Sequence, residues 1–440
     1  MTDTRSGETV DPGLLCPLDP ANMLEPEFMF RTLRERPGLF KVEGQRDIYV
    51  ASRHDDISYV LTHDNGDPIS REYLTDVTRG AAEAGDTKPS FSIYSGEGIH
   101  PEAAEILKGY VQTRALENVD PPLHTRHRAL VSKVFTPRRV EELKPYIRDL
   151  AETLVSGWDT AEPVDFVSQF AQLIPMTVIA DQLGVGRDRF EDFQRWSAAE
   201  VGALAGPVAY EDQPTHATAM VELQKFLGEL VDERRSQPVQ KTDDILGGLI
   251  NAEVDGVASL SREEVIRICS TLLRGGMETT SNLMGSTMYR LLIDPELMSL
   301  VRRDPSRIPD VVEETLRVEP PVQSMFRETR RDIEIGGTLV PSGSLIMLLF
   351  GAANTDSSHF PDPKCLDPDR KNSRSHLTFG HGLHFCLGSN LARAEAAIGL
   401  EVVLQRTSNL TLAVAESELE RLWAVVIRGF KALPVNATLA

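Results

Sequence analysis

A cysteine surrounded by glycines and histidines is the first candidate for chemistry in this sequence. The segment FGHGLHFCLG at residues 379–388 contains one cysteine, Cys386. A thiolate is both a nucleophile and a metal ligand, and closely spaced glycines let a backbone bend sharply or approach a flat group. The segment therefore indicates a loop that presents the Cys386 sulfur to a bound group. Zinc is an alternative because His381 and His384 are close by, although no fourth ligand follows at a usual spacing.

A second chemical pattern lies inside a long helical segment. Residues 259–295 predict one helix of roughly thirty residues, about 45 Å long, with a serine and acidic residues at its start. Its centre holds Gly275, Gly276, Glu278 and Thr279. Two adjacent glycines cost a helix roughly 1 kcal/mol each relative to alanine, so they need a reason such as a groove for a flat ligand. A plain kink with solvated polar side chains is the alternative.

A third pattern pairs an acid with an arginine just before two prolines. Glu314 and Arg317 are three residues apart, on one face of a helix that the following prolines should end. Taken alone, such a pair is usually a weak surface ion pair.

Together, the three segments resemble the cytochrome P450 family. Residues 379–388 fit its haem-binding signature F-G-x-G-x-H-x-C-x-G, the centre of the long helix fits its oxygen-binding signature, and Glu314 with Arg317 fits its E-x-x-R element. The order and the spacing of the segments also agree. The resemblance covers most of residues 20–440 and is weakest at about 65–118 and 185–240.

The resemblance implies a mainly α fold with small β-sheets (α+β). We expect a single triangular-prism-like domain over residues 21–440, with haem buried between the long central helix and the cysteine loop, and no fused reductase or ferredoxin. Residues 1–20 are expected to form a flexible N-terminal arm. Helical periodicity at about 138–235 and 261–317, with extended segments at 40–52 and 332–350, agrees with this fold class.

The resemblance also assigns the cofactor and its contacts. The cofactor would be heme b (iron protoporphyrin IX), with Cys386 as the axial thiolate ligand of its iron and O2 as co-substrate. Backbone amides of the loop, and the positive end of the helix that follows, would stabilise the thiolate. The cofactor-binding residues expected are His124, Arg128, Arg327, Phe379, His384, Cys386 and Gly388.

Four of these residues would bind the haem propionates, which need cationic or hydrogen-bonding partners. They are His124, Arg128, Arg327 and His384. Solvated charges on a helix face or at a sheet edge are the alternative for the first three.

Catalytic roles follow from the same resemblance. Thr279 would hydrogen-bond the oxygen and Glu278 would relay protons from solvent, which predicts a monooxygenase that performs hydroxylation or oxidative demethylation. A haem carrier or sensor would not need this pair, and a peroxide-driven relative would be expected to lack it. Glu314 and Arg317, with Arg370, would form a buried pair that holds the haem loop.

The substrate is less well defined by the sequence. The expected substrate contacts are Arg274, Gly275, Val322 and Val426. Arg274 occupies a position where many family members carry an apolar residue, so we hypothesise a small or medium-sized substrate that is anionic or rich in oxygen. The alternative is that Arg274 turns away and pairs with a propionate or a local acid.

Composition limits the partners. A formal net charge of −20 over 440 residues makes nucleic-acid binding improbable, and no apolar run is long enough for membrane insertion. The four cysteines form no CxxC pair, and no structural disulfide is expected. We therefore expect a cytoplasmic monomer.

Electrons would have to come from an external ferredoxin and its ferredoxin reductase. A local positive patch would receive the acidic ferredoxin, and ordinary solubilising charge is the alternative reading of each residue in it. The patch would comprise Arg126, Lys133, Arg138, Arg139 and Arg393.

Overall fold

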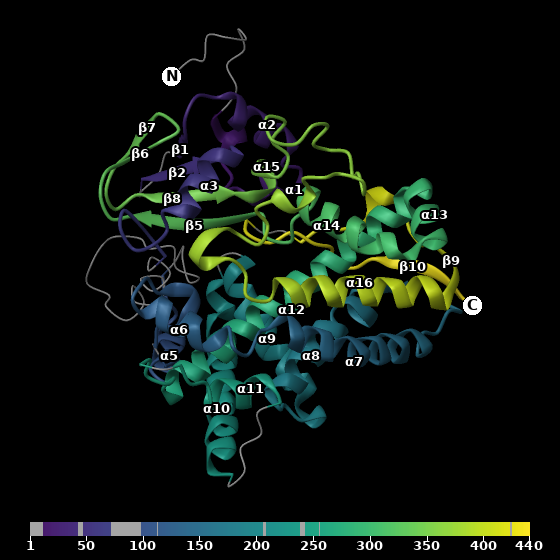
Figure 1. Ribbon diagram of the computed structural model, residues 1–440, viewed down its shortest axis with the longest axis horizontal. Coiled ribbons are helices and arrows are strands. Elements are labelled where there is room, and N and C mark those ends of the chain that lie inside the picture. The colour runs from purple at the N-terminus through teal and green to yellow at the C-terminus, as the bar shows by residue number, and fades with distance from the viewer. Residues whose placement is uncertain are drawn as a thin grey trace.

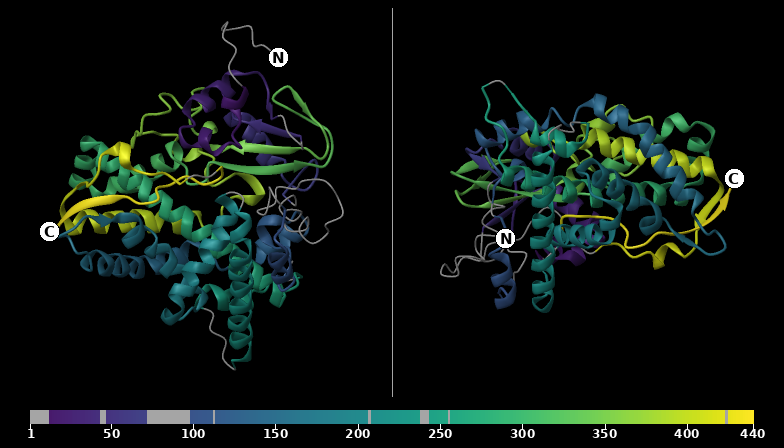
Figure 2. Two further views of the ribbon diagram at one scale, coloured as in Figure 1. Left: turned by 180° about the vertical axis from the view of Figure 1, so that it is seen from behind. Right: turned by 90° about the horizontal axis from the view of Figure 1, so that it is seen from below.

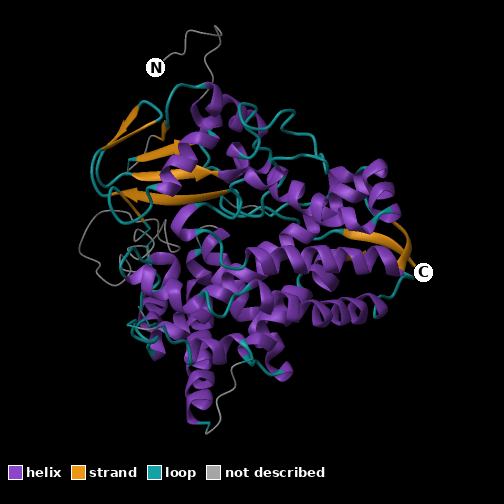
Figure 3. Ribbon diagram, viewed as in Figure 1, coloured by secondary structure: helices purple, strands orange, loops and turns teal. Residues whose placement is uncertain are grey.

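Helices fill most of the molecule, and the largest sheet lies at one corner (Figure 3). The computed structural model describes residues 12–42, 47–71, 98–111, 113–205, 208–237, 243–254, 256–422 and 425–440. The described helices are α1 (Pro20–Leu24), α2 (Glu27–Glu35), α3 (His54–Thr62), α5 (Pro101–Leu107), α6 (Leu123–Val131), α7 (Pro137–Ser156), α8 (Leu173–Leu183), α9 (Phe190–Ala205), α10 (Gln213–Ser236), α11 (Ile245–Ile250), α12 (Arg262–Ile293), α13 (Pro295–Arg303), α14 (Ile308–Val318), α15 (Phe350–Ala353) and α16 (Ser389–Arg406).

The long helix predicted from the sequence is α12. It contains 32 residues, which corresponds to about 48 Å. The Ser261 hydroxyl accepts a hydrogen bond from the Glu264 N–H, and the Glu264 carboxylate accepts one from the Ser261 N–H. This capping box fixes where the helix begins. Helices α8, α10, α14 and α16 pack against α12, which therefore lies in the interior (Figure 1).

In the described part of the chain, three small sheets accompany the helices. The five-stranded sheet has the order β1-β2-β8-β5-β3, in which only β2 and β8 are parallel. The three-stranded sheet β4-β10-β9 lies at the opposite side of the molecule, beside the C-terminus (Figure 2). The strands are β1 (Phe40–Val42), β2 (Ile48–Ala51), β3 (Ile69–Ser70), β4 (Val164–Asp165), β5 (Ser324–Thr329), β6 (Ile333–Ile335), β7 (Thr338–Val340), β8 (Leu345–Leu349), β9 (Thr407–Leu412) and β10 (Pro434–Leu439).

The fold class expected from the sequence is confirmed. Helices dominate, and the sheets are small. The extended segments predicted at 40–52 and 332–350 contain β1, β2, β6, β7 and β8.

The N-terminal arm is partly folded. Pro12–Leu15 form a short 3-10 helix, and Leu15 is buried against Met29 and Phe30 of α2. Residues 1–11 of the arm lie outside the described residues. None of the described helices combines the length and the apolar character needed to cross a membrane.

Candidate haem and oxygen site

The hydrophobic core is interrupted at the middle of α12. The apolar side chains between Val265 and Leu273 belong to one cluster, which includes side chains of α9, α10 and α11. Those between Leu283 and Leu291 belong to another, with side chains of α7, α14 and α16. Between the two clusters, Gly275 is exposed although its helix is enclosed. A Cβ added to Gly275 or Gly276 would meet no atom within 4 Å. The two glycines therefore border internal space, and the helix continues through them without a break.

The Cys386 loop bends where the glycines predicted. Gly380 and Gly382 both have φ near +71°, which few other residues adopt. A Cβ on Gly382 would come within 2.6 Å of the Leu61 carbonyl oxygen, so the loop also passes close to α3. The Cys386 N–H donates to the Phe379 carbonyl at 2.9 Å and closes the loop.

The surroundings of Cys386 favour a thiolate only in part. Burial raises the pKa of the Cys386 thiol, whereas the N–H groups of Gly388 and Ser389 and the charges of Arg128 and Arg393 act in the opposite direction. Helix α16 begins at Ser389, so its positive end lies beside the sulfur, as predicted. A bound metal ion would supply the remaining stabilisation of the negative charge.

Two buried histidine nitrogens lack partners next to this loop. Among the described residues, neither His124 Nδ1 nor His384 Nε2 has a hydrogen-bond partner, and the two ring centroids are 4.1 Å apart. An unpaired buried polar group costs about 1–3 kcal/mol, and a carboxylate that accepts from both rings would remove this cost. The pair thus fits the propionates of a haem, as does Arg128, one helical turn after His124.

Arg327, which the sequence predicts to bind a haem propionate, is bound to an acid of this chain. It is buried, and its guanidinium is bound to the Asp64 carboxylate and to the Phe326 carbonyl. Asp64 and Asp120 offer oxygens within 4.8 Å of a ring nitrogen of His384. Arg327 therefore neutralises an acid in this region, and its contact with a propionate stays a prediction.

The predicted catalytic pair lies on α12 at the interruption of the core. The Thr279 hydroxyl donates to the Gly275 carbonyl at 2.7 Å, one turn back along the helix. Burial raises the pKa of Glu278, and the Asn282 amide, which donates to its carboxylate at 3.3 Å, opposes the shift. Glu278 is therefore biased towards the protonated form, in which it can donate a proton.

Glu314 and Arg317 form the buried pair that the sequence predicted. Arg317 donates to both carboxylate oxygens of Glu314 at 2.7 and 2.9 Å. It also donates to the carbonyls of Asn354, Pro363 and Cys365, and Arg370 donates to Glu314 at 3.0 Å. The pair ties α14 to the segment that precedes the cysteine loop. The Cys365 residue itself is exposed.

Arg274 pairs with acids. Its Nη2 donates to Glu117 Oε1 at 2.8 Å, and its Nη1 donates to Glu200 Oε2 at 3.3 Å. Glu117 lies in the 3-10 turn Leu116–Asn118, and Glu200 is a fully buried residue of α9. The alternative in which Arg274 finds a local acid is therefore the arrangement seen.

The predicted apolar substrate contacts come together from two distant segments. Val322 pairs with Ile427 in an isolated bridge, and the Gln323 N–H donates to the Val426 carbonyl at 2.7 Å. Val322 and Val426 are both half-buried. Residues 72–97, 206–207 and 423–424 lie outside the described residues.

Several cations of the expected positive patch already have acid partners. Arg126 is bound to Glu264 at 2.7 and 2.8 Å, and Arg393 to Glu313 at 2.7 Å through each of two nitrogens. Lys133 and Arg138 are exposed, but Arg138 pairs with Glu142 at 2.9 Å and Lys133 donates to the Glu253 carbonyl at 2.6 Å. Arg139 is half-buried.

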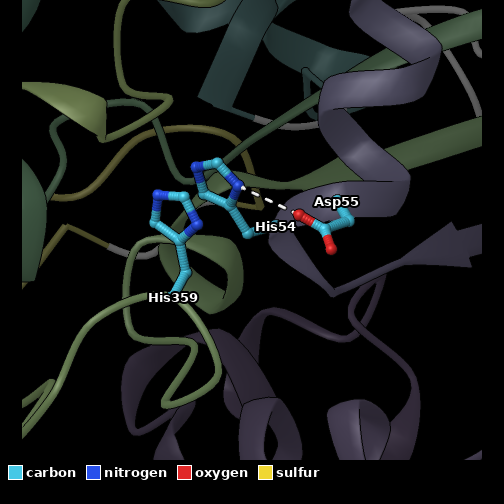
Figure 4. Close-up of side chains that lie close together, drawn as sticks. All are labelled: His54, Asp55 and His359. Carbon is cyan, nitrogen blue, oxygen red and sulfur yellow. Dashed lines mark ion pairs between the residues drawn. The ribbon is translucent and has the colours of Figure 1, made fainter.

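A second histidine cluster comprises His54 and His359, with Asp55 beside His54 (Figure 4). The rings of His54 and His359 stack with centroids 3.6 Å apart and planes 12° from parallel, and Asp55 lies beside His54. One nitrogen of each ring is already bonded to Ser375. The nitrogen lone pairs of stacked imidazole rings lie in two separate parallel planes. In this arrangement His54 and His359 therefore cannot bind the same metal ion. Among the described residues, no potential metal-binding group contains Cys386, which disfavours the zinc alternative.

Sequence reasoning missed Asn282, Glu117 and Glu200. Asn282 follows Glu278 by one helical turn, which is a recognisable signal for a side-chain contact. Nothing in the sequence marks the two glutamates, because they reach Arg274 only through the tertiary fold.

Comparisons with known proteins agree with this geometry. The family model described as Cytochrome P450 matches residues 95–418. The chain is 40% identical to cytochrome P450 107B1 of Saccharopolyspora erythraea over 320 residues, which cover 72% of this chain and 76% of the relative. It is 36% identical to 6-deoxyerythronolide B hydroxylase of the same organism over 332 residues, 76% of this chain and 80% of the relative. The solved structure of cytochrome P450 CYP109Q5 from Chondromyces apiculatus aligns with a TM-score of 0.80 and 33% identity, over 97% of this chain and 98% of that one.

Proposed function

Since this chain belongs to the cytochrome P450 family, we propose that it hydroxylates or oxidatively demethylates a medium-sized organic molecule, with electrons from an external ferredoxin. Its general activity is that of a cytochrome P450 monooxygenase, with heme b as cofactor and O2 as co-substrate. The observation that carries the finer proposal is the interruption of the core at Gly275 and Gly276, beside Glu278 and Thr279.

The residues that would hold the cofactor fit it. Cys386 would bind the iron, His124, Arg128 and His384 would bind the propionates, and Phe379, Gly388 and Gly275 would border the ring. When bound, haem supplies the reductive activation of O2, in which one oxygen atom enters the substrate and the other leaves as water, with two electrons and two protons consumed.

The chain supplies the protons through α12. Burial raises the pKa of Glu278, which favours a proton on its carboxyl group, and Asn282 orients that group. The Thr279 hydroxyl, which now donates to the Gly275 carbonyl, can turn towards the internal space and hydrogen-bond the oxygen there. Both groups act by positioning protons, as general acid catalysis requires.

The electron donor is proposed from charge. Lys133 and Arg138 are exposed cations on a protein of net charge −20, and a local positive surface would orient an acidic ferredoxin. We also propose that the protein works as a cytoplasmic monomer. The name of the relative 6-deoxyerythronolide B hydroxylase supports hydroxylation as the reaction type.

The first experiment is the absorption spectrum of the purified protein, reduced with dithionite, with and without carbon monoxide. A strongly red-shifted Soret band is expected from thiolate ligation by Cys386. A band at the position typical of histidine-ligated haem would contradict the assignment of Cys386.

The second experiment separates an oxygenase from a passive haem protein. Thr279→Ala should still consume reductant and O2 but release peroxide in place of product. Fully coupled product formation by Thr279→Ala would contradict the proposed role of the hydroxyl.

A further inference from the structure

The acids that hold Arg274 cancel its charge. Arg267, two turns earlier on α12, also donates to Glu117 Oε1 at 3.1 Å and to the Tyr110 hydroxyl at 2.7 Å. The cluster thus contains two guanidinium groups and two carboxylates, Glu117 and Glu200. Burial opposes the ionisation of Glu117, but Arg267 and Arg274 outweigh it and lower its pKa, so that this carboxylate is charged.

Arg274 still has hydrogen-bond donors to offer. A guanidinium carries five N–H donors, and the two bonds to Glu117 and Glu200 use one on Nη1 and one on Nη2. Nε of Arg274 has no hydrogen-bond partner among the described residues and is not buried, and the side chain as a whole is 17% exposed. At least this donor is therefore accessible, on the residue directly before the exposed Gly275.

The position of Arg274 is fixed from both sides. Glu200 reaches it from α9, and Glu117 from the turn Leu116–Asn118. That turn is itself anchored, because the Leu116 N–H donates to the buried ring of His127 at 3.1 Å. A guanidinium held in this way loses little conformational freedom when a further acceptor binds it.

We propose that Arg274 determines substrate specificity by donating hydrogen bonds to a neutral oxygen acceptor, such as a ketone, ester or amide carbonyl, and that Glu117 and Glu200 cancel its charge so that carboxylates are not favoured. This inference rests on the proposed function, because it concerns the pocket of the same monooxygenase. The sequence suggested an anionic or an oxygen-rich substrate, and this inference favours the oxygen-rich one.

The test uses azole probes, because 4-phenylimidazole binds haem iron and extends a phenyl group into the pocket. Three derivatives of nearly equal shape are compared on the intact holoenzyme: acetyl, isopropenyl and carboxylate, each at the meta and para positions. Their dissociation constants are measured from the Soret shift. The acetyl probe should bind about tenfold more tightly than the isopropenyl probe, as one hydrogen bond to a charged donor predicts, and the carboxylate probe should bind no better than the acetyl probe.

Two variants test the charge balance. Glu200→Gln keeps the shape but leaves one net positive charge, so the carboxylate probe should gain about tenfold in affinity while the acetyl probe changes little. The charge-balanced double variant Arg274→Met with Glu200→Gln should abolish the preference for acetyl over isopropenyl. Glu222→Gln is the matched control, since the Glu222 side chain is 43% exposed and contacts α9 through Trp196 and Arg195. It should change none of the affinities.

Several results would overturn the proposal. Equal binding of the acetyl and isopropenyl probes by the unmodified protein would show that Arg274 donates nothing to ligands. Preference for the carboxylate probe would show that its charge is not cancelled, and exclusion of all three derivatives while 4-phenylimidazole binds would show that its donors cannot be reached. The comparison of the three probes on the unmodified protein does not depend on whether any variant folds. The carbon monoxide spectrum of the same preparation reports separately on the proposed function.

Discussion

Arg317→Met should detach the segment that supports the cysteine loop. The Arg317 side chain is completely buried and makes two bonds to Glu314 and three to backbone carbonyls. Methionine has a similar length and no donors, so it removes these bonds without leaving a large cavity. The variant therefore reports on the polar contacts of Arg317 rather than on packing.

The size of the effect follows from what remains after the change. Glu314 keeps Arg370 at 3.0 Å and the Asp367 N–H at 2.9 Å, and the Cys365 carbonyl keeps Arg370 at 3.1 Å. The carbonyls of Asn354 and Pro363 lose the Arg317 donor. Breaking a buried ion pair costs about 3–5 kcal/mol and each orphaned carbonyl about 1–3 kcal/mol, so we expect a loss of about 5 kcal/mol. That loss is a large part of the roughly 5–15 kcal/mol that stabilises a typical protein.

The assay is denaturant unfolding of the holoenzyme, followed by the Soret band and by far-ultraviolet circular dichroism. Arg317→Met should lose haem at a denaturant concentration well below that of the unmodified protein. Arg148→Met is the matched control, because Arg148 forms a partly exposed pair with Glu401 that is worth less than about 1 kcal/mol. If the two variants lose similar stability, the buried pair does not hold the loop.

Three further predictions concern α12 and the acidic limb of stability. Glu278→Gln should slow product formation by about a hundredfold, the usual range for a lost general acid, while substrate affinity from the spin-state shift stays unchanged; an unchanged rate would exclude Glu278 from proton delivery. Gly276→Ala should stabilise the haem-free chain to heat by about 1 kcal/mol, whereas Gly429→Ala, whose Cβ would lie 2.1 Å from Asn282 Oδ1, should lower its melting temperature. Burial opposes ionisation of Glu313, but its partners outweigh it and lower its pKa to about 2 from 4.5, so its pairing stabilises the fold above pH 4.5 and is lost as the pH falls towards 2. Glu313→Gln should flatten that acid limb in unfolding curves, and an unchanged limb would assign it to other acids.

Local signals in the sequence were sufficient for the elements that build the site. Ser261 with Glu264 predicts where α12 begins, because a capping box needs only residues three apart. The glycines around Cys386 predict a bent loop for a similar reason. Glu314 and Arg317 were placed on one helical face by their spacing, although their burial came from the family resemblance and not from the spacing.

The charge environment of the site could not be predicted in this way. Arg274 is separated by 157 residues from Glu117 and by 74 from Glu200, and Arg327 by 263 residues from Asp64. No periodicity links positions so far apart, and an arginine in a sequence looks the same whether its partner is a ligand or an acid. Arg393 illustrates the same limit, because it was expected on the surface and is bound to Glu313.

These pairings have a consequence for the electrostatics at Cys386. Most cations around the site have an acid partner, as Arg274, Arg327 and Arg393 do, so their fields largely cancel beyond the first few ångströms. In the described part of the chain, Arg128 has no acid partner, and the interaction with Cys386 opposes the lowering of its pKa by burial. The groups that stabilise a thiolate here are therefore the Gly388 N–H, Arg128, Arg393 and the Ser389 N–H. The two N–H groups are fixed by the start of α16. A propionate bound by Arg128 would offset the positive charge of its guanidinium. The N–H groups of Gly388 and Ser389 would then stabilise the thiolate equally well with or without bound haem.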